Sequence, residues 1–253
     1  QRDNGSVMPN IYHTGITPPP PSMKIDGFEI CYYPVLKVEY ESINVPQEIS
    51  DILKLNPIVL LMSKNAVIGL DKWLAHFGMG SMYFSEVNFW AVGDRTHTCL
   101  KRVLGIQSFF PEEMTGKGVV LALQKQNNSR VLLISCQEPQ QEFIDGLTSA
   151  RITFFHFPVY KICIDENSEF SAHFKNAESS YLILTSPSAV KGVIKSLSLP
   201  DLSNLKIRII SIGPTTSKAI YKNRGNIFLE SKVQNINALY DNLFNLISES
   251  SYS

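Results

Sequence analysis

The sequence predicts an α/β protein with two doubly wound, mostly parallel β-sheets that are joined by a two-stranded β linker. Three observations predict this fold: an internal repeat, an alternation of short apolar runs with amphipathic helical patterns, and two extended segments that each contain a proline. A chain of 253 residues is long enough to form two domains, each with its own hydrophobic core.

The internal repeat consists of three segments that recur in the same order along the chain. The matched pairs are Tyr33–Val38 with Phe157–Ile162, Leu61–Val67 with Leu184–Val190, and Ala91–Thr96 with Ser211–Thr216. Several matches in one order are typical of a structural unit that occurs twice. We therefore predict two related domains.

Each copy alternates a predicted strand with a predicted helix. Ile58–Met62 is short, apolar and followed by a polar turn, which is typical of a buried strand. The residues that follow place apolar side chains on one helical face, and Tyr181–Thr185 begins the same pattern in the second copy. Further strands are predicted at Asn88–Val92, Arg130–Ser135, Ile152–Phe155, Ile207–Ile212 and Ile227–Leu229. This alternation indicates parallel sheets covered on both faces, and right-handed crossovers make each domain flavodoxin-like.

The two proline-containing segments indicate how the domains are connected. If they pair, one carries the chain out of the first domain and the other brings it back. The first domain is then discontinuous, with residues 8–35 and 160–253, and residues 38–157 form the inserted second domain. A plain tandem arrangement is the alternative. Residues 1–7 precede Met8, a candidate natural start, and are either residues added for expression or native sequence.

Composition excludes several classes of function. Lys and Arg number 23, as do Asp and Glu, so no basic field indicates a nucleic-acid partner. The four cysteines have no CxxC spacing and the five histidines no metal-ligand spacing, which predicts reduced thiols and no bound metal. No apolar run is long enough for a membrane span and the start lacks a secretion signal, so we expect a cytoplasmic protein.

Polar loops follow the predicted strands at four related places. They are Ser63–Asn65, Gly93–Thr96, Ser186–Ser188 and Gly213–Thr216. Ligands of open parallel sheets bind beyond the carboxyl ends of strands, where backbone N–H groups at helix starts attract anions. Each loop alone is explained by helix capping. Four related loops on two domains favour a ligand cleft lined by both.

Tyr160 breaks the internal symmetry, because its counterpart in the other copy is Leu36. A phenol at this position can donate a proton or a hydrogen bond to a leaving oxygen. The alternative interpretation is a tyrosine that packs on the linker.

The ordered motifs resemble uroporphyrinogen-III synthase over nearly the whole chain. The residues that carry the resemblance are Thr185–Val190, Ile212–Ala219, Ala91–Thr96, Thr115–Gly118 and Pro158–Tyr160. The resemblance implies two flavodoxin-like domains, a monomer, and a cofactor-independent hydro-lyase that cyclises hydroxymethylbilane with inversion of ring D. It also suggests a transient contact with hydroxymethylbilane synthase.

The resemblance further implies the site residues. Tyr160 would help the terminal hydroxyl of the substrate to depart. The implied substrate-binding residues are Ser63, Lys64, Thr96, Ser186, Ser188, Arg208, Gly213, Thr215 and Thr216. One departure is clear: the family's first strand often ends in Thr-Arg, whereas here His13–Thr17 precedes a proline run, so the first helix should be short or missing. The competing hypothesis is a non-catalytic, two-domain cytosolic binding protein or sensor for a small anion.

Overall fold

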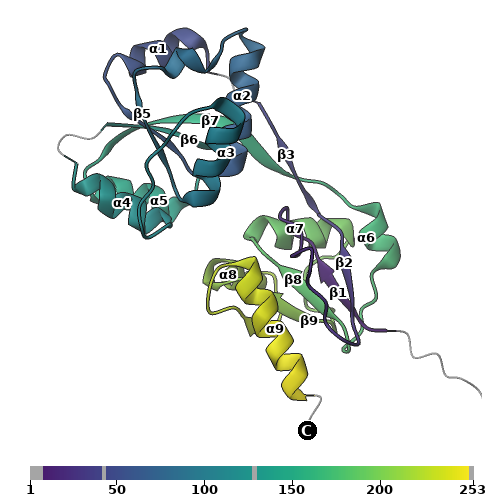
Figure 1. Cartoon of the computed structure of the whole chain (residues 1–253). Helices are drawn as coiled ribbons and strands as arrows, with labels where there is room; N and C mark the ends of the chain where they lie inside the picture. The colour runs from purple at the N-terminus through teal and green to yellow at the C-terminus, as the bar shows by residue number, and fades with distance from the viewer. Residues whose placement is uncertain (1–7, 42–43, 127–129, 251–253) are drawn as a thin grey trace, which may run out of the picture. The chain divides into compact units, whose positions relative to one another are not determined.

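The computed structural model describes residues 8–41, 44–126 and 130–250. Residues 1–7, which are either added for expression or native, lie outside this range. The chain forms two compact units, Gln1–Lys37 with Cys163–Ser253 (unit 1) and Val38–Ile162 (unit 2). In Figure 1 the purple N-terminal strands belong with the green and yellow C-terminal part, and the blue-to-teal segment forms unit 2. Tyr160, which we expected in the discontinuous domain, therefore belongs to unit 2.

Unit 1 contains a five-stranded sheet with the order β10-β9-β8-β1-β2, in which all neighbouring strands are parallel. Its strands are β1 (Asn10–His13), β2 (Glu29–Tyr32), β8 (Tyr181–Leu184), β9 (Arg208–Ser211) and β10 (Ile227–Glu230). Its helices are α6 (Ser168–His173), α7 (Pro187–Ser196), α8 (Pro214–Lys222) and α9 (Ile236–Ser250). Numbered within the unit, the strand order is 2-1-3-4-5, which is the flavodoxin order.

Successive residues of the central strand β1 pack into two different cores, because side chains alternate between the faces of a sheet. Tyr12 contributes to the core that α7 and α8 cover, whereas Ile11 packs with Tyr240 of α9. The segment between β1 and β2 contains bends and turns and no helix. This confirms the expectation drawn from the proline run.

Unit 2 contains a second five-stranded sheet, with the order β3-β7-β6-β4-β5. Its strands are β3 (Leu36–Glu39), β4 (Ile58–Leu61), β5 (Asn88–Ala91), β6 (Arg130–Cys136) and β7 (Thr153–Ile164). Its helices are α1 (Pro46–Leu53), α2 (Lys64–His76), α3 (Asp94–Leu104), α4 (Gly116–Gln124), α5 (Gln141–Ser149) and the short 3₁₀ helix η1 (Ser81–Phe84). Strands β4 to β7 repeat the order of unit 1, and β3 takes the place of the fifth strand. The predicted fold class is confirmed.

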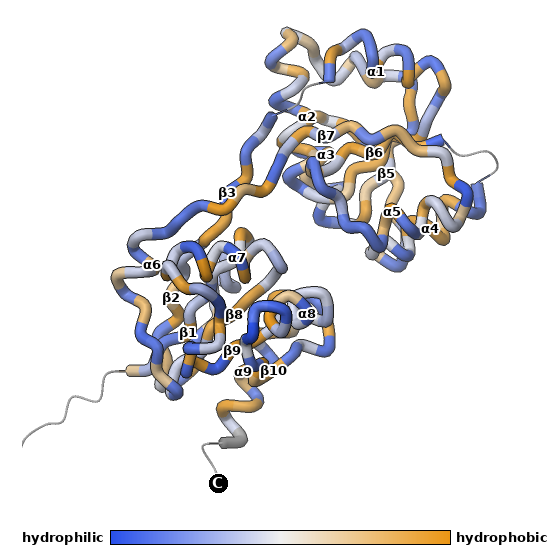
Figure 2. Tube along the Cα trace, turned by 180° about the vertical axis from the view of Figure 1, so that it is seen from behind, coloured by the Kyte–Doolittle hydropathy of each residue, from blue (hydrophilic) through white to orange (hydrophobic). Residues whose placement is uncertain are grey.

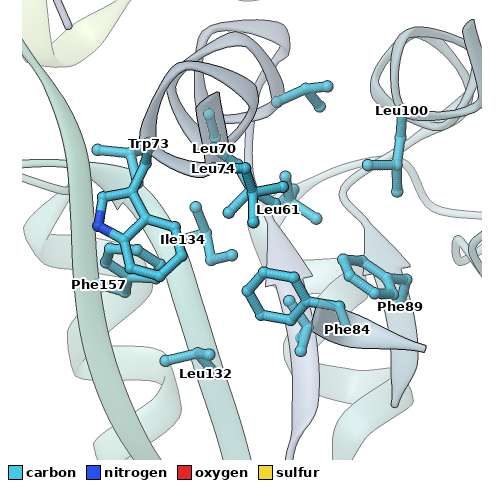
Figure 3. Close-up of a cluster of buried hydrophobic side chains, with 14 of the residues drawn as sticks. Leu61, Leu70, Trp73, Leu74, Phe84, Phe89, Leu100, Leu132, Ile134 and Phe157 are labelled. Carbon is cyan, nitrogen blue, oxygen red and sulfur yellow. The ribbon is translucent and has the colours of Figure 1, made fainter. Parts of the chain in front are cut away.

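Apolar residues of the strands and of α2 form the core of unit 2. The trace of β5, β6 and β7 is mostly hydrophobic, whereas the outer helices alternate in hydropathy (Figure 2). In Figure 3, Trp73 of α2 lies over Phe157 of β7, and their ring centroids are 5.0 Å apart. Such edge-to-face aromatic pairs add to the stabilisation that burial itself provides.

Strand β7 differs from the prediction, because one strand of 12 residues replaces a short strand and a separate extended segment. Its pairing with β6 shifts register: Ser135 pairs with Pro158, but Cys136 pairs with Tyr160. Val159 is thus an extra residue, a β-bulge next to a proline that has no N–H to donate. As a result, the consecutive side chains of Val159 and Tyr160 enter the same core.

Helix α2, which follows β4, and helix α7, which follows β8, each contact a Pro-Val segment through a glycine. A Cβ atom on Gly69 of α2 would lie 2.7 Å from the carbonyl oxygen of Val159. A Cβ atom on Gly192 of α7 would lie 2.8 Å from the carbonyl oxygen of Val35. These distances leave no room for a side chain at either glycine. The two copies of the sequence repeat therefore pack a helix against a Pro-Val segment in the same way.

Candidate functional site

The loop after β4 brings two predicted site residues into contact. Ser63 is the N-cap of α2, and its Oγ accepts a hydrogen bond from the backbone N–H of Ala66 at 3.1 Å. The same Oγ lies 3.0 Å from the hydroxyl of Tyr160, and either group can donate. The bulge in β7 turns the phenol toward this loop, at the carboxyl end of the sheet.

Burial determines the ionisation of Tyr160. The residue is 7% exposed, and burial raises the pKa of its phenol to about 12. The hydrogen bond with Ser63 lowers this pKa, but by less than burial raises it. The phenol therefore stays protonated at neutral pH. It can donate a hydrogen bond but cannot act as a base.

A second tyrosine, which the sequence did not indicate, lies beside this pair. The hydroxyl of Tyr40 is 3.0 Å from Oδ1 of Asn65, and its ring centroid is 6.4 Å from that of Tyr160. Lys64, the first residue of α2, is exposed next to them. Tyr40 follows β3, so only the pairing of β3 with β7 brings it here.

Thr96 and Thr216 occupy matching positions in the first turns of α3 and α8. Each helix has an N-cap glycine, Gly93 or Gly213, and each threonine is the third residue after it. Both side chains are nearly buried, at 4% and 3% exposure. Within the described ranges neither hydroxyl bonds to another protein group, which leaves both able to bind a ligand.

In unit 1 the loops after β1 and β8 touch each other. The Thr14 hydroxyl donates to the carbonyl oxygen of Ile183 at 3.0 Å, and a Cβ on Gly15 would lie 2.3 Å from Oγ1 of Thr185. These two strands are neighbours at the point where the order of the sheet reverses, which is where such folds bind ligands.

Ser186 has the same capping role as Ser63. It is the N-cap of α7, and its Oγ accepts from the backbone N–H of Ala189 at 3.0 Å. Because this contact uses a lone pair, the hydroxyl proton remains able to bind an anion. Ser188 lies half-buried in the same turn, and exposed Thr215 lies beside Thr216 in the first turn of α8.

Arg208 lies apart from the other predicted residues, because it begins β9 and so lies at the amino end of that strand. Its Nη1 donates to the hydroxyl of Tyr181 at 3.0 Å. The guanidinium carbon is 5.6 Å from the ring centroid of Tyr181 and 5.0 Å from that of Phe228. The structure therefore gives Arg208 aromatic neighbours at the opposite edge of the sheet from Ser186 and Thr216.

His13, one of the five histidines without metal-ligand spacing, connects three parts of unit 1. It is fully buried at the end of β1, with Nε2 2.8 Å from the carbonyl oxygen of Thr17 and Nδ1 3.0 Å from the hydroxyl of Tyr240. Burial lowers the pKa of His13 to about 4. The neutral ring donates from Nε2 and accepts at Nδ1, so it fixes the loop that replaces the first helix.

The cysteines are free thiols, and the described residues contain no group of three or more His, Cys, Asp or Glu side chains that could hold a metal. None of the described helices is long and apolar enough to cross a membrane. The arrangement therefore consists of neutral hydroxyl donors and helix N-termini at the carboxyl edge of each sheet. Such groups can bind carboxylates without a metal ion.

Residues 22–241 match the family model described as uroporphyrinogen-III synthase HemD. The chain belongs to the uroporphyrinogen-III synthase family. Enzymes of this family are hydro-lyases of tetrapyrrole biosynthesis.

Solved structures of family members have the same fold. The uroporphyrinogen-III synthetase of Helicobacter pylori is 20% identical, with a TM-score of 0.63 over 95% of this chain and 100% of that one. A mutant uroporphyrinogen III synthase of Thermus thermophilus is 14% identical, with a TM-score of 0.52 over 88% and 91% of the two chains. A comparison with curated protein sequences found no significant match.

Proposed function

We propose that this chain is a uroporphyrinogen-III synthase whose catalytic group is the hydroxyl of Tyr160. The reaction removes water from hydroxymethylbilane, closes the ring through the substituted carbon of ring D and releases uroporphyrinogen III. The observation that carries the proposal is the buried, protonated phenol of Tyr160 in contact with Ser63 at the carboxyl edge of its sheet.

The role of Tyr160 follows from its ionisation. The leaving hydroxyl of the bilane becomes a better leaving group when it accepts a hydrogen bond, and a phenol with a pKa of about 12 donates one throughout the physiological range. Ser63 fixes the direction of this phenol, because the Ser63 side chain is itself held by the N–H of Ala66. As the C–O bond breaks, Tyr160 gives its proton to the departing hydroxyl, which leaves as water, and the Ser63 hydroxyl stabilises the phenolate. Ring closure of the cation then releases one proton, which returns to Tyr160.

The polar loops have the other role, which is to bind carboxylates. The substrate bears eight of them, and helix N-termini with hydroxyl side chains bind such groups without Lys or Arg. We assign this role to Ser63, Lys64 and Thr96 in unit 2, and to Ser186, Ser188, Gly213, Thr215 and Thr216 in unit 1. Arg208 is left out because it lies at the amino ends of the strands. Holding the bilane in a folded conformation favours ring closure at the correct carbon.

The remaining expectations are part of the same proposal: no organic cofactor or metal, a cytoplasmic monomer, and at most a transient contact with hydroxymethylbilane synthase. The free cysteines support a reducing compartment.

The test couples the purified chain to hydroxymethylbilane synthase and separates the product isomers. We expect the type III isomer from the wild type and a markedly slower reaction from Tyr160→Phe. Tyr221→Phe, a matched change at an exposed tyrosine of α8, should leave the rate unchanged. Type I product alone from the wild type would refute the function and favour the anion-binding protein. An unchanged rate in Tyr160→Phe would refute only the role of the phenol.

A further inference from the structure

One polar network in unit 1 is not used by the proposed mechanism and has no counterpart in unit 2. It joins Ser211 at the end of β9, Ser217 in α8 and Glu230 at the end of β10. The Oγ atoms of Ser211 and Ser217 are 2.8 Å apart, and the Ser217 hydroxyl contacts a carboxylate oxygen of Glu230. Both serines are buried, at 0% and 3% exposure.

The network ends on the backbone of the loop that begins α8. The backbone N–H of Gly213 donates to Oγ of Ser211 at 3.3 Å, and the hydroxyl of Ser211 lies 3.0 Å from the carbonyl oxygen of Gly213. That carbonyl also accepts the N–H of Ser217 at 3.0 Å. The N–H of Gly213 is therefore held by a side chain of the network, and its carbonyl oxygen by the backbone of α8.

The matching loop of unit 2 is held differently. In the repeat, Ala91 takes the place of Ser211 and His97 takes the place of Ser217, so the two hydroxyl groups are missing. There a methionine supports the loop, because the N–H of Asp94 contacts Sδ of Met114 at 3.3 Å. The hydroxyl network is thus a specific property of the Gly213–Thr216 loop.

We propose that Glu230 is a positioning residue, which acts through Ser217 and Ser211 to fix the Gly213–Thr216 loop that binds a carboxylate of the substrate. An ionised carboxylate can only accept hydrogen bonds, so it determines that the Ser217 proton points toward Glu230. The lone pairs of Ser217 then face Ser211, which donates its proton to Ser217, and the Ser211 oxygen accepts the backbone N–H of Gly213. The role in binding rests on the proposed function, whereas the fixing of the loop does not.

The first test measures steady-state kinetics with hydroxymethylbilane. Removing a charge-assisted hydrogen bond should raise KM about tenfold in Glu230→Ala and in Ser217→Ala, with kcat changed by less than about twofold. Glu230→Gln keeps an acceptor for Ser217 and should restore KM. Asp241→Ala, an exposed carboxylate on α9, is the matched control and should leave KM unchanged. An unchanged KM in Glu230→Ala, or no restoration by Glu230→Gln, would overturn the proposed role in binding.

The second test is independent of activity. Amide hydrogen exchange should become faster in the peptide that covers residues 212–218 in Glu230→Ala, and it should return to the wild-type rate in Glu230→Gln. Exchange that is unchanged in this peptide would overturn the proposal even if the wild type forms the type III isomer. If the wild type forms only type I, the proposed function fails, and the exchange experiment still decides whether Glu230 fixes the loop.

Discussion

Acid should destabilise unit 1 through His13 in a way that can be measured. The perturbation is a fall in pH from 7.5 to 4.5. Burial lowers the pKa of His13 from 6.5 to about 4, so the folded state keeps the ring neutral while the unfolded state takes up a proton. The stabilisation is complete above pH 6.5 and is lost as the pH falls toward 4. Between pH 7.5 and 4.5 the free energy of unfolding should fall by about 2.5 kcal/mol.

The assay must report the unfolding of unit 1, which contains His13. Both tryptophans of the chain, Trp73 and Trp90, lie in unit 2, so their fluorescence reports the unfolding of that unit. Urea unfolding followed by circular dichroism, with hydrogen exchange in peptides of unit 1, measures the stability that His13 affects. Carboxylates also titrate in this range, and burial lowers the pKa of His156 in unit 2. The comparison therefore uses the difference between proteins at each pH.

Two variants separate the contribution of His13 from the rest. His13→Gln cannot titrate, so its free energy of unfolding should fall less steeply between pH 6.5 and 4 than that of the wild type. His76→Gln, at an exposed position at the end of α2, is the matched control and should keep the wild-type slope. Equal slopes for the wild type and His13→Gln would refute the assignment of a buried, neutral imidazole.

Two further predictions concern packing and the substrate site. Gly69→Ala and Gly192→Ala should each destabilise their own unit by about 1–3 kcal/mol in urea unfolding, because the new Cβ meets a backbone carbonyl. Gly146→Ala in α5, where only a side-chain methyl lies 3.3 Å away, should be tolerated, and equal stabilities for all three variants would contradict this reasoning. Arg208→Gln should leave KM for hydroxymethylbilane unchanged and cost about 1 kcal/mol in a melting experiment. A large rise in KM would instead place Arg208 at the substrate.

The sequence was sufficient to predict the elements that repeat. The matches of Leu61–Val67 with Leu184–Val190 and of Ala91–Thr96 with Ser211–Thr216 placed four strand-to-helix loops correctly at the carboxyl ends of strands. Ser63 and Ser186 were visible as helix caps, because polar residues directly follow apolar runs. Local patterns of this kind depend only on neighbouring residues.

Contacts between distant segments could not be predicted in the same way. His13 meets Tyr240 across 227 positions of sequence, and no local pattern indicates this contact. Arg208 was assigned to the substrate site by the family resemblance, and it lies only a few residues before the Gly213 loop in sequence. However, the four residues of β9 separate it from that loop by the length of a strand. The register of β6 against β7 was hidden as well, since a bulge changes the face on which every later side chain lies.

The β-bulge at Val159 determines which face of the sheet the Tyr160 phenol lies on. If Val159 were paired regularly and not bulged, alternation would point the Tyr160 ring to the far side of the sheet and separate its hydroxyl from Ser63. Deletion of Val159 would remove the bulge and still leave the tyrosine on the face of Phe157, because Tyr160 already pairs with Cys136. An alignment of related chains must allow for a single gap at this place before it can judge whether a tyrosine in β7 is equivalent to Tyr160.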